Sequence, residues 1–541
     1  MSLNLKRHYR LLILFVLVVV LCIVALRYTR IIAYTVPGEK EAVERIKNYE
    51  NEVDLLDPTV VHEVVILMSE EDQQKMLATY QQTGEKDYFE VDVIIDGVRI
   101  NSVGIRLKGN SSLRSAAGGG FGDRGFDRGN IIPPEGQQMP GRDRQRVQPP
   151  GGITLPTPGA GGDIVPPEGI QPPGGLAWPN TEGQGNLVPP QGALPQPSGQ
   201  AAPGAAWPET ASRGGGNLPY LIKFDRFVSG QRYQGLAEIA LRTSGASGDI
   251  SLLQEPVSNA ILNEVGIPIA RSVYGSVQMT GGEAKLYTIA EHMDQTYLNR
   301  ILPDSDGVLY KVTQVGNDFS YLGEDPTLYA NIFDQETAKK KADLAPLIDF
   351  IRFVNQSTDE EFAGQLAERL DIVAFADYLA VHNLLGNNDS LAGMGNNYYL
   401  YYDFDTEKFT ILSWDMNESL GKLSMGSGSQ IDIYWEGVGV MFGRGFGDAP
   451  GGRGKHLLLQ RFLANAEFRA LYKERYRLLY EQIYENDLLT PKIEAFAALV
   501  TDYSAEHSIV DQTAFDAAVS KNLSFVAQRH EYLTSTEMAG E

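Results

Sequence analysis

A long low-complexity stretch, residues 113–216, is the strongest constraint on how this chain can fold. It holds 18 of the 28 prolines and repeats short strings such as PPEG and PPGG. A segment of this composition cannot bury enough apolar surface to offset the entropy lost on ordering, so we predict a disordered insertion. Strand-like sequence precedes it and resumes at Tyr220–Phe227. The insertion therefore interrupts a sheet, either passively or as a segment that contacts a cell wall or a partner.

Alternating apolar residues predict that the first half of the chain is rich in β-strands. Two hairpins are indicated, one over 89–107 around Asp96-Gly97 and one over 269–292 around Gly281-Gly282. Asp-Gly between alternating runs is a strong signal for a two-residue turn. Ser69, with Asp72 three residues later, has the pattern of a helix N-cap and predicts a helix to Tyr80.

The second half has a different periodicity. From about Gly307 the pattern becomes mostly helical, with amphipathic segments at 347–355, 360–370, 371–385 and 456–534. Asp371 stands where a helix N-cap is expected. A run of strands followed by a run of helices predicts an α+β, two-lobed fold, with a β-rich N-lobe over 56–300 and a helical C-lobe over 301–541.

The N-terminus has the features of a membrane anchor. Lys6, Arg7 and Arg10 precede residues 11–26, which are uncharged and almost wholly apolar. Flanking basic side chains can extend such a run to the thickness of a bilayer core. We predict an uncleaved signal anchor within 1–36 and a charged stalk over 37–55. The charges before the segment favour a single-pass protein with an extracytoplasmic body.

Composition excludes several classes of protein. The net charge is −23, and no long basic stripe suits nucleic acid as a main partner. The only cysteine, Cys22, lies in the apolar run, so no disulfide can form within one chain. The seven histidines are scattered without the spacing of a zinc site.

Residues 383–421 carry the pattern with most chemical content. Asp389, Asn397 and Asp415 surround a predicted hairpin of two aromatic and β-branched runs, 397–400 and 409–414. One acid can take the proton of an acceptor hydroxyl, while an amide and a second acid can hold Mg²⁺ against nucleotide phosphates. The alternative is that these residues only stabilise turns, as Asp and Asn often do.

Ordered short motifs resemble the CotH kinase family, the atypical protein kinases related to spore coat protein H. The matching strings are GIRLKGNSS at Gly104–Ser112, LIKFDRF at Leu221–Phe227, AEHMD at Ala290–Asp294, GVLYK at Gly307–Lys311, and Asp389 with NYYLY and WD. Together they cover about residues 60–530 without the insertion. The resemblance implies a bilobal atypical protein-kinase-like fold with ATP and Mg²⁺ between the lobes.

The resemblance also implies roles for single residues. Asp389 resembles the catalytic acid, and Asn397 and Asp415 resemble the two metal ligands. Lys223 resembles the strand lysine that contacts the α- and β-phosphates. Further candidates for contact with the nucleotide are a rival lysine, the residues of the turn after a strand, and an acid between the lobes: Lys108, Asn110, Ser111, Ser112 and Glu291.

The chain departs from the pattern of ordinary kinases in several places. Asn397 follows Asp389 by eight positions instead of five, so Asn396 or Asn388 are alternative amides. Either Glu255 or Glu264 could pair with Lys223. Asn417 stands where family members often carry a second acid.

Two functions fit this sequence. The first is a membrane-anchored kinase that transfers the γ-phosphoryl group of ATP to Ser or Thr of a protein partner. The second is a non-catalytic surface or scaffold protein that faces the cell wall, because an external domain meets little ATP and a Pro/Gly-rich insertion suits contact with the wall.

Overall fold

The computed structural model describes residues 47–109, 113, 217–243, 249–303, 306–340, 344–422, 428–436 and 456–536. The predicted anchor within 1–36, most of the stalk and nearly all of the insertion lie outside these residues. Among the described residues, no helix combines the length and the apolarity that a membrane crossing requires.

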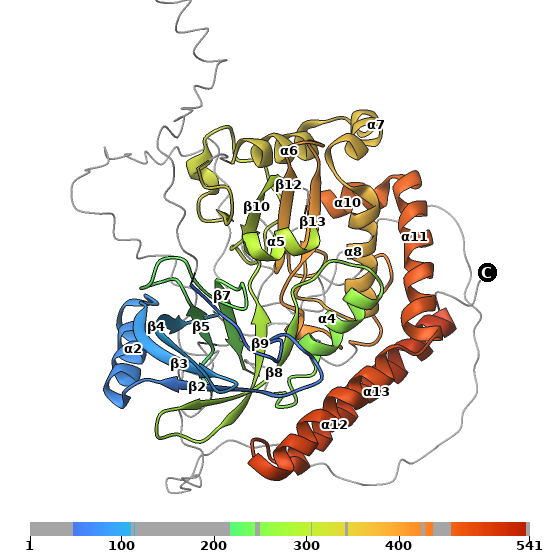
Figure 1. Ribbon diagram of the computed structural model, residues 1–541. Helices are drawn as coiled ribbons and strands as arrows, with labels where there is room; N and C mark the ends of the chain where they lie inside the picture. The colour runs from blue at the N-terminus through green and yellow to red at the C-terminus, as the bar shows by residue number, and fades with distance from the viewer. Residues whose placement is uncertain are drawn as a thin grey trace, which may run out of the picture. The chain divides into compact units, whose positions relative to one another are not determined.

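Seven of the described strands close into a barrel in the order β2-β3-β4-β5-β7-β9-β8 (Figure 1). Their bounds are β2 His62–Leu67, β3 Phe89–Ile95, β4 Val98–Leu107, β5 Tyr220–Lys223, β7 Glu238–Arg242, β8 Ser272–Met279 and β9 Lys285–Glu291. Neighbours are antiparallel except β2 and β8, whose parallel pairing closes the barrel. Both predicted hairpins, β3–β4 and β8–β9, are confirmed.

The barrel shows how the fold tolerates the insertion. The insertion leaves after β4 and returns before β5, and these strands pair directly, with Leu107 opposite Tyr220. The chain therefore departs and re-enters at one point of the sheet. Because the entropy of loop closure grows only slowly with loop length, a long segment at this point costs the barrel little.

Local turn and cap chemistry explains the first elements. Asp96 and Gly97 have φ of 47° and 83°, the left-handed values that a tight hairpin turn requires. Helix α2, Glu70–Thr83, begins as predicted, since the Ser69 hydroxyl accepts from the backbone N–H of Asp72 at 3.1 Å. It runs three residues beyond the predicted end. Strand β1, Lys47–Tyr49, pairs in parallel with β6, Gln231–Tyr233.

A second, four-stranded sheet has the order β11-β10-β12-β13. Its strands are β10 Gly307–Val312, β11 Phe333–Gln335, β12 Tyr398–Asp403 and β13 Phe409–Ser413. The prediction of mostly helical structure from Gly307 is wrong for β10, which pairs with β12. A short buried apolar run cannot be assigned to strand or helix from periodicity alone. Gly307 itself is required, since a Cβ atom there would lie 2.4 Å from the carbonyl oxygen of Tyr402.

Helices form most of the rest of the described chain. Their bounds are α4 Gln254–Glu264, α5 Gln295–Ile301, α6 Ala345–Gln356, α7 Asp359–Arg369, α8 Ile372–Leu384, α10 Leu457–Ala464, α11 Ala466–Tyr480, α12 Leu489–His507 and α13 Gln512–Thr536. Three shorter helical turns are η2 Pro326–Tyr329, η3 Met416–Glu418 and η4 Glu481–Glu485. Asp371 caps α8 as predicted, accepting from Val373 and Ala374.

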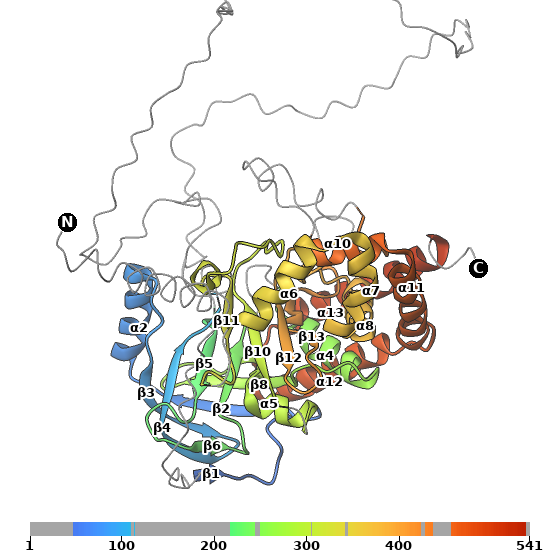
Figure 2. The ribbon, with the colours of Figure 1, turned by 90° about the horizontal axis from the view of Figure 1, so that it is seen from above.

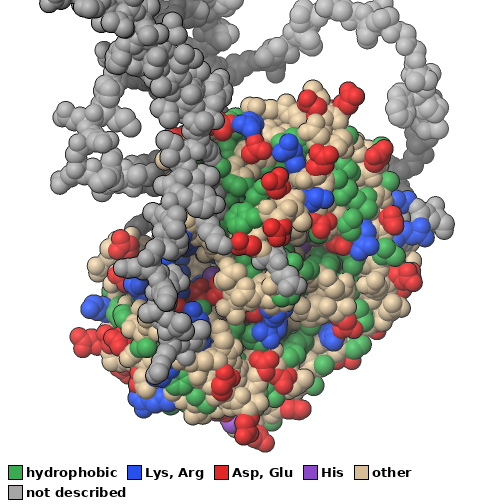
Figure 3. All heavy atoms as spheres, turned by 45° about the horizontal axis from the view of Figure 1, so that its top comes forward, with side chains coloured by type: hydrophobic (Ala, Val, Ile, Leu, Met, Phe, Trp, Pro, Cys, Tyr) green, Lys and Arg blue, Asp and Glu red, His purple; other side chains and the backbone are tan. Residues whose placement is uncertain are grey.

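Helix α4 joins the barrel to the helical part. It packs against β8 of the barrel and against η3 and α12 of the helical part. Its Val257 and Ile261 belong to the same apolar core as Leu379 of α8 and Phe496 of α12. Figure 2 shows the barrel strands beside the helices that this core connects. The observed fold is therefore of the α+β class. On its surface, acidic and basic side chains are interspersed over the face shown in Figure 3.

Candidate active site

The hairpin β12–β13 brings two predicted metal ligands to one end. Tyr398 pairs with Ser413, so Asn397 and Asp415 both lie just beyond the first pair of the ladder. The predicted hairpin is thus confirmed, and 18 positions of sequence separation become a short separation in space. Both residues have left-handed backbones, with φ of 48° at Asn397 and 56° at Asp415. Asn and Asp tolerate this region better than most residues, which helps explain their presence here.

Asp389 lies in the loop between α8 and β12. Its two carboxylate oxygens accept from Asn396 Nδ2 at 3.0 Å and from Asn397 Nδ2 at 2.8 Å. Its backbone N–H donates to Asn387 Oδ1 at 3.1 Å. Both Asn396 and Asn397, which the sequence left as alternatives, therefore orient this acid. The pKa of Asp389 is raised to about 7, chiefly by burial; the hydrogen bond from the Asn396 amide lowers it in part, and the charge of Asp415 adds to the rise.

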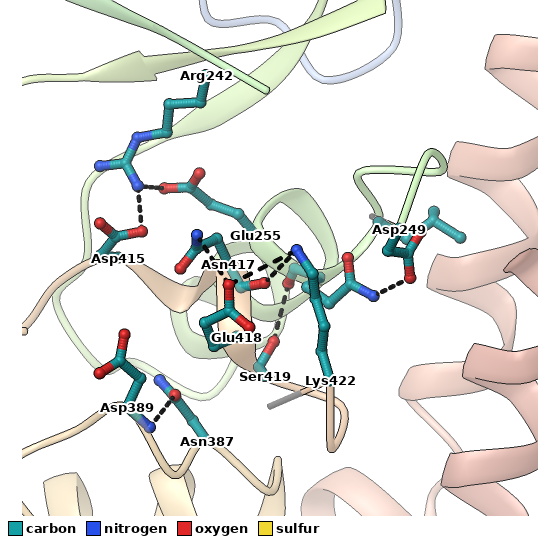
Figure 4. Close-up of polar contacts among 12 residues, drawn as sticks. Arg242, Asp249, Glu255, Asn387, Asp389, Asp415, Asn417, Glu418, Ser419 and Lys422 are labelled. Atoms are coloured by element: carbon teal, nitrogen blue, oxygen red, sulfur yellow. Dashed lines mark hydrogen bonds and ion pairs between the residues drawn. The ribbon is translucent and has the colours of Figure 1, made fainter. Parts of the chain in front are cut away.

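Arg242 is a site residue that the sequence analysis missed. It is the last residue of β7, and its Nη1 lies 3.1 Å from Glu255 Oε1 and also donates to Asp415 Oδ1 (Figure 4). Its guanidinium lies 4.5 Å from the centre of the Trp414 ring. The sequence feature that could have indicated Arg242 is a basic residue at the end of an apolar strand, shortly before a helix.

Glu255 is the acid of helix α4 nearest to this centre. It is 4% exposed, and burial raises its pKa to about 7, with Arg242 acting in the opposite direction. The other helix glutamate, Glu264, pairs with Lys492 at 2.8 Å. The predicted ion pair between Lys223 and a helix glutamate is therefore wrong, because Glu255 pairs with Arg242 instead.

The predicted phosphate-binding residues have different surroundings. Lys223 lies 3.4 Å from Asp225 and 3.6 Å from Glu238, the residue opposite it on β7. Lys108 lies near the proposed metal ligand Asp415, since its Nζ is 5.4 Å from the centre of the neighbouring Trp414 ring. Burial, followed by the charges of Lys311 and Arg242, places its pKa well below the usual value.

The other predicted nucleotide contacts are Glu291 and three residues of the turn expected after β4. The carboxylate of Glu291 is 2% exposed and pairs with Arg271 and Arg300, which makes it a structural acid of the barrel edge. Asn110, Ser111 and Ser112 lie outside the described residues.

A second acid stands one residue beyond the predicted place. Asn417 is followed by Glu418, which is 8% exposed and lies 3.8 Å from Lys422 Nζ. Burial raises the pKa of Glu418, and the charge of Asp415 raises it too, although Lys422 opposes them. Figure 4 shows Asn417, Glu418 and Lys422 beside Asp415. The second acid that family members often carry at the position of Asn417 is thus replaced here by Glu418, the next residue.

The donor set fits Mg²⁺ better than a metal that needs a protein cage. In the described part of the chain, no group of three or more His, Cys, Asp or Glu side chains could hold a metal. Mg²⁺ is commonly bound by one or two carboxylates together with phosphates and water. Asp415 provides a carboxylate. The Asn397 amide donates to Asp389 through Nδ2, so its oxygen Oδ1 can serve as a metal ligand. The buried Asn417 Oδ1 has no hydrogen-bond partner among the described residues and is a further candidate ligand.

Comparisons with known proteins give distant matches. Inner spore coat protein H of Bacillus subtilis (strain 168) is 23% identical over 313 residues, which cover 57% of this chain and 80% of that protein. The crystal structure of the Helicobacter pylori proinflammatory kinase CtkA is 10% identical, covers 56% of this chain and 91% of that one, and gives a TM-score of 0.26. A structural likeness this weak carries no argument.

The family comparison covers more than half of the chain. Residues 213–533 match the family described as CotH kinase protein. The matched span begins before β5, ends within α13, and includes Arg242, Asp389, Asn397 and Asp415. Since the resemblance of the short motifs and the match over this span agree, the chain belongs to the CotH kinase family.

Proposed function

We propose that this protein is a Mg²⁺-dependent phosphotransferase that moves the γ-phosphoryl group of ATP to a Ser or Thr hydroxyl of a protein partner. The observation that carries the proposal is the position of Asp415 and Asn397 at one end of the β12–β13 hairpin, with Asn397 holding Asp389. An acid for the acceptor and ligands for a metal are the parts that phosphoryl transfer requires.

Asp389 is the residue proposed to position and deprotonate the acceptor hydroxyl. Amide donors on both carboxylate oxygens fix its orientation. A general base works best when its pKa is near the operating pH, and burial raises the pKa of Asp389 to about 7. The same two amides leave the carboxylate with further lone pairs that can accept from a substrate hydroxyl.

Asp415 and Asn397 are the proposed metal ligands, with Asn417 nearby. Bound Mg²⁺ would neutralise the negative charge of the transferring phosphoryl group. Lys108, whose Nζ lies 5.4 Å from the centre of the Trp414 ring, is a further basic side chain in the same region, and a phosphate bound beside it would favour its protonated form.

The setting of the reaction is also a proposal. The apolar segment 11–26 supports a single-pass membrane protein with an extracytoplasmic body. The same segment favours the second candidate, a non-catalytic surface protein that contacts the cell wall through the insertion, because ATP is scarce outside the cytoplasm.

The two candidates are separated by nucleotide binding and by transfer. The full chain, purified in detergent, would be melted with and without Mg-ATP, alongside Asp415→Ala. The phosphotransferase predicts stabilisation of the unsubstituted chain, through preferential binding to the folded state, and little or none in the variant. Asp389→Asn should keep that stabilisation and lose transfer to protein acceptors. The absence of any shift at millimolar Mg-ATP would leave the surface protein as the better explanation.

A further inference from the structure

The Arg242 guanidinium is only partly satisfied by its protein partners. The residue is 9% exposed, and both ion pairs, to Glu255 and to Asp415, use Nη1. The buried Nε and Nη2 atoms find no hydrogen-bond partner among the described residues. Leaving buried donors of a charged group unsatisfied is costly, so Nε and Nη2 of Arg242 are available to an acceptor from outside the described residues.

Two lysines near Arg242 also favour an anionic ligand. The same Trp414 ring lies 4.5 Å from the Arg242 guanidinium and 5.4 Å from Lys108 Nζ. Lys311 Nζ lies 5.8 Å from the ring of Tyr399, which itself packs edge-on against Trp414 at 5.7 Å. Three basic side chains thus gather over two neighbouring aromatic rings beside Asp415, where the proposed metal would bind, and an anion bound there would favour the protonated form of Lys108.

We propose that Arg242, and not Lys223, is the side chain that contacts the phosphates of the bound nucleotide. The inference rests on the proposed function, since it concerns the same nucleotide. Lys223 already lies near two carboxylates, Asp225 and Glu238. Arg242 pairs with the helix acid Glu255 through one nitrogen and keeps two donors for phosphate oxygens.

The position of Arg242 in the fold supports this role. It ends the strand β7 that precedes α4, and its partner Glu255 lies in the first turn of that helix. In protein kinases a strand lysine pairs with a glutamate of the following helix and contacts the phosphates. A planar guanidinium can hold a carboxylate on one edge and phosphate oxygens on another, which an ammonium group cannot do in the same geometry.

The test is the affinity of the full chain for ADP with MgCl₂, measured by isothermal titration calorimetry. ADP carries the α- and β-phosphates and cannot be used for γ-phosphoryl transfer. Arg242→Ala could fail to fold because Glu255 would be left buried and unpaired. We therefore choose the double variant Arg242→Met with Glu255→Gln, which keeps the bulk of the side chain and removes the unpaired charge.

Two matched controls accompany the double variant. Glu255→Gln alone retains Arg242, and Lys223→Met removes one positive charge from the neighbouring strand. We expect the double variant to bind ADP about 10- to 100-fold more weakly than Glu255→Gln, the range for losing hydrogen bonds to a charged group. Lys223→Met should change the affinity less than threefold, and all variants should keep a cooperative melting transition.

The outcomes distinguish failure of the two proposals. No ADP binding by the unsubstituted chain would overturn the proposed function together with the role of Arg242. If the unsubstituted chain binds ADP and the double variant binds as well as Glu255→Gln does, only the role of Arg242 is overturned. A loss in Lys223→Met as large as that in the double variant would restore Lys223 as the phosphate contact.

Discussion

Replacing Asp389 by Asn should change how the stability of the metal-free protein depends on pH. Burial raises the pKa of the folded Asp389 from 3.8 to about 7. The folded state therefore binds this proton more tightly than the unfolded state does. Its contribution to stability is fully present below about pH 4 and is lost as pH rises through about 7.

The size of the effect follows from the two pKa values. One pKa unit corresponds to about 1.36 kcal/mol. Between pH 5.5 and 8.5, a carboxyl group with a pKa of 3.8 unfolded and about 7 folded loses about 2 kcal/mol of stabilisation. Because Asp389 is only partly buried, we expect about 1–2 kcal/mol.

Asparagine cannot titrate, so the variant should lack this slope. The Asn side chain would also turn an amide donor toward Asn396 or Asn397, which costs a similar amount at every pH. The informative quantity is therefore the change with pH in the difference between the two proteins, and not its size at one pH.

The assay is urea unfolding of both proteins in a chelating buffer at pH 5.5, 7 and 8.5. The variant should gain about 1–2 kcal/mol relative to the unsubstituted protein from the lowest pH to the highest. Glu255→Gln should show the same trend, since burial raises the pKa of Glu255 to about 7 as well. Parallel stability curves for Asp389→Asn and the unsubstituted protein would refute the assignment of a raised pKa to Asp389 in the folded state.

Three further predictions concern the fold. Deleting residues 115–215 should leave the melting temperature nearly unchanged, because Leu107 and Tyr220 pair directly; a large drop would mean that the deleted segment stabilises the barrel. Asp371→Ala should cost about 1 kcal/mol of unfolding free energy in urea, through loss of the α8 cap. Gly307→Ala should cost about 2–3 kcal/mol because its Cβ atom would meet Tyr402, and an unchanged urea midpoint would contradict this.

Local signals in the sequence predicted the parts of the fold that local chemistry determines. The Asp96-Gly97 turn and the caps at Ser69 and Asp371 are formed by residues next to one another in the chain. Strand β10 was missed because its apolar run is short and buried, and its pairing with β12 joins segments about 90 positions apart. Periodicity contains no information about such a partner.

The candidate site divides in the same way. The β12–β13 hairpin is local, so its signal placed Asn397 and Asp415 together correctly. Arg242 reaches Asp415 from a strand 173 positions away, and a basic residue at the end of an apolar strand does not by itself identify that partner. Lys223 was favoured from its motif, yet its side chain lies beside Asp225 and Glu238. The motifs indicated phosphoryl-transfer chemistry, whereas the pairing of the barrel strands determines that Arg242 is the basic side chain in contact with Asp415.

The left-handed backbone at Asn397 and Asp415 links the fold to the chemistry. Such residues cost free energy and persist only where the surrounding structure holds them. Here Asn397 precedes β12 and donates to Asp389, while Asp415 follows β13, precedes η3 and accepts from Arg242. Each is thus held both by the hairpin and by a side-chain partner. Both side chains are therefore oriented by the protein itself, so in the proposed reaction binding energy would go to orienting phosphate and hydroxyl instead of to ordering these two residues.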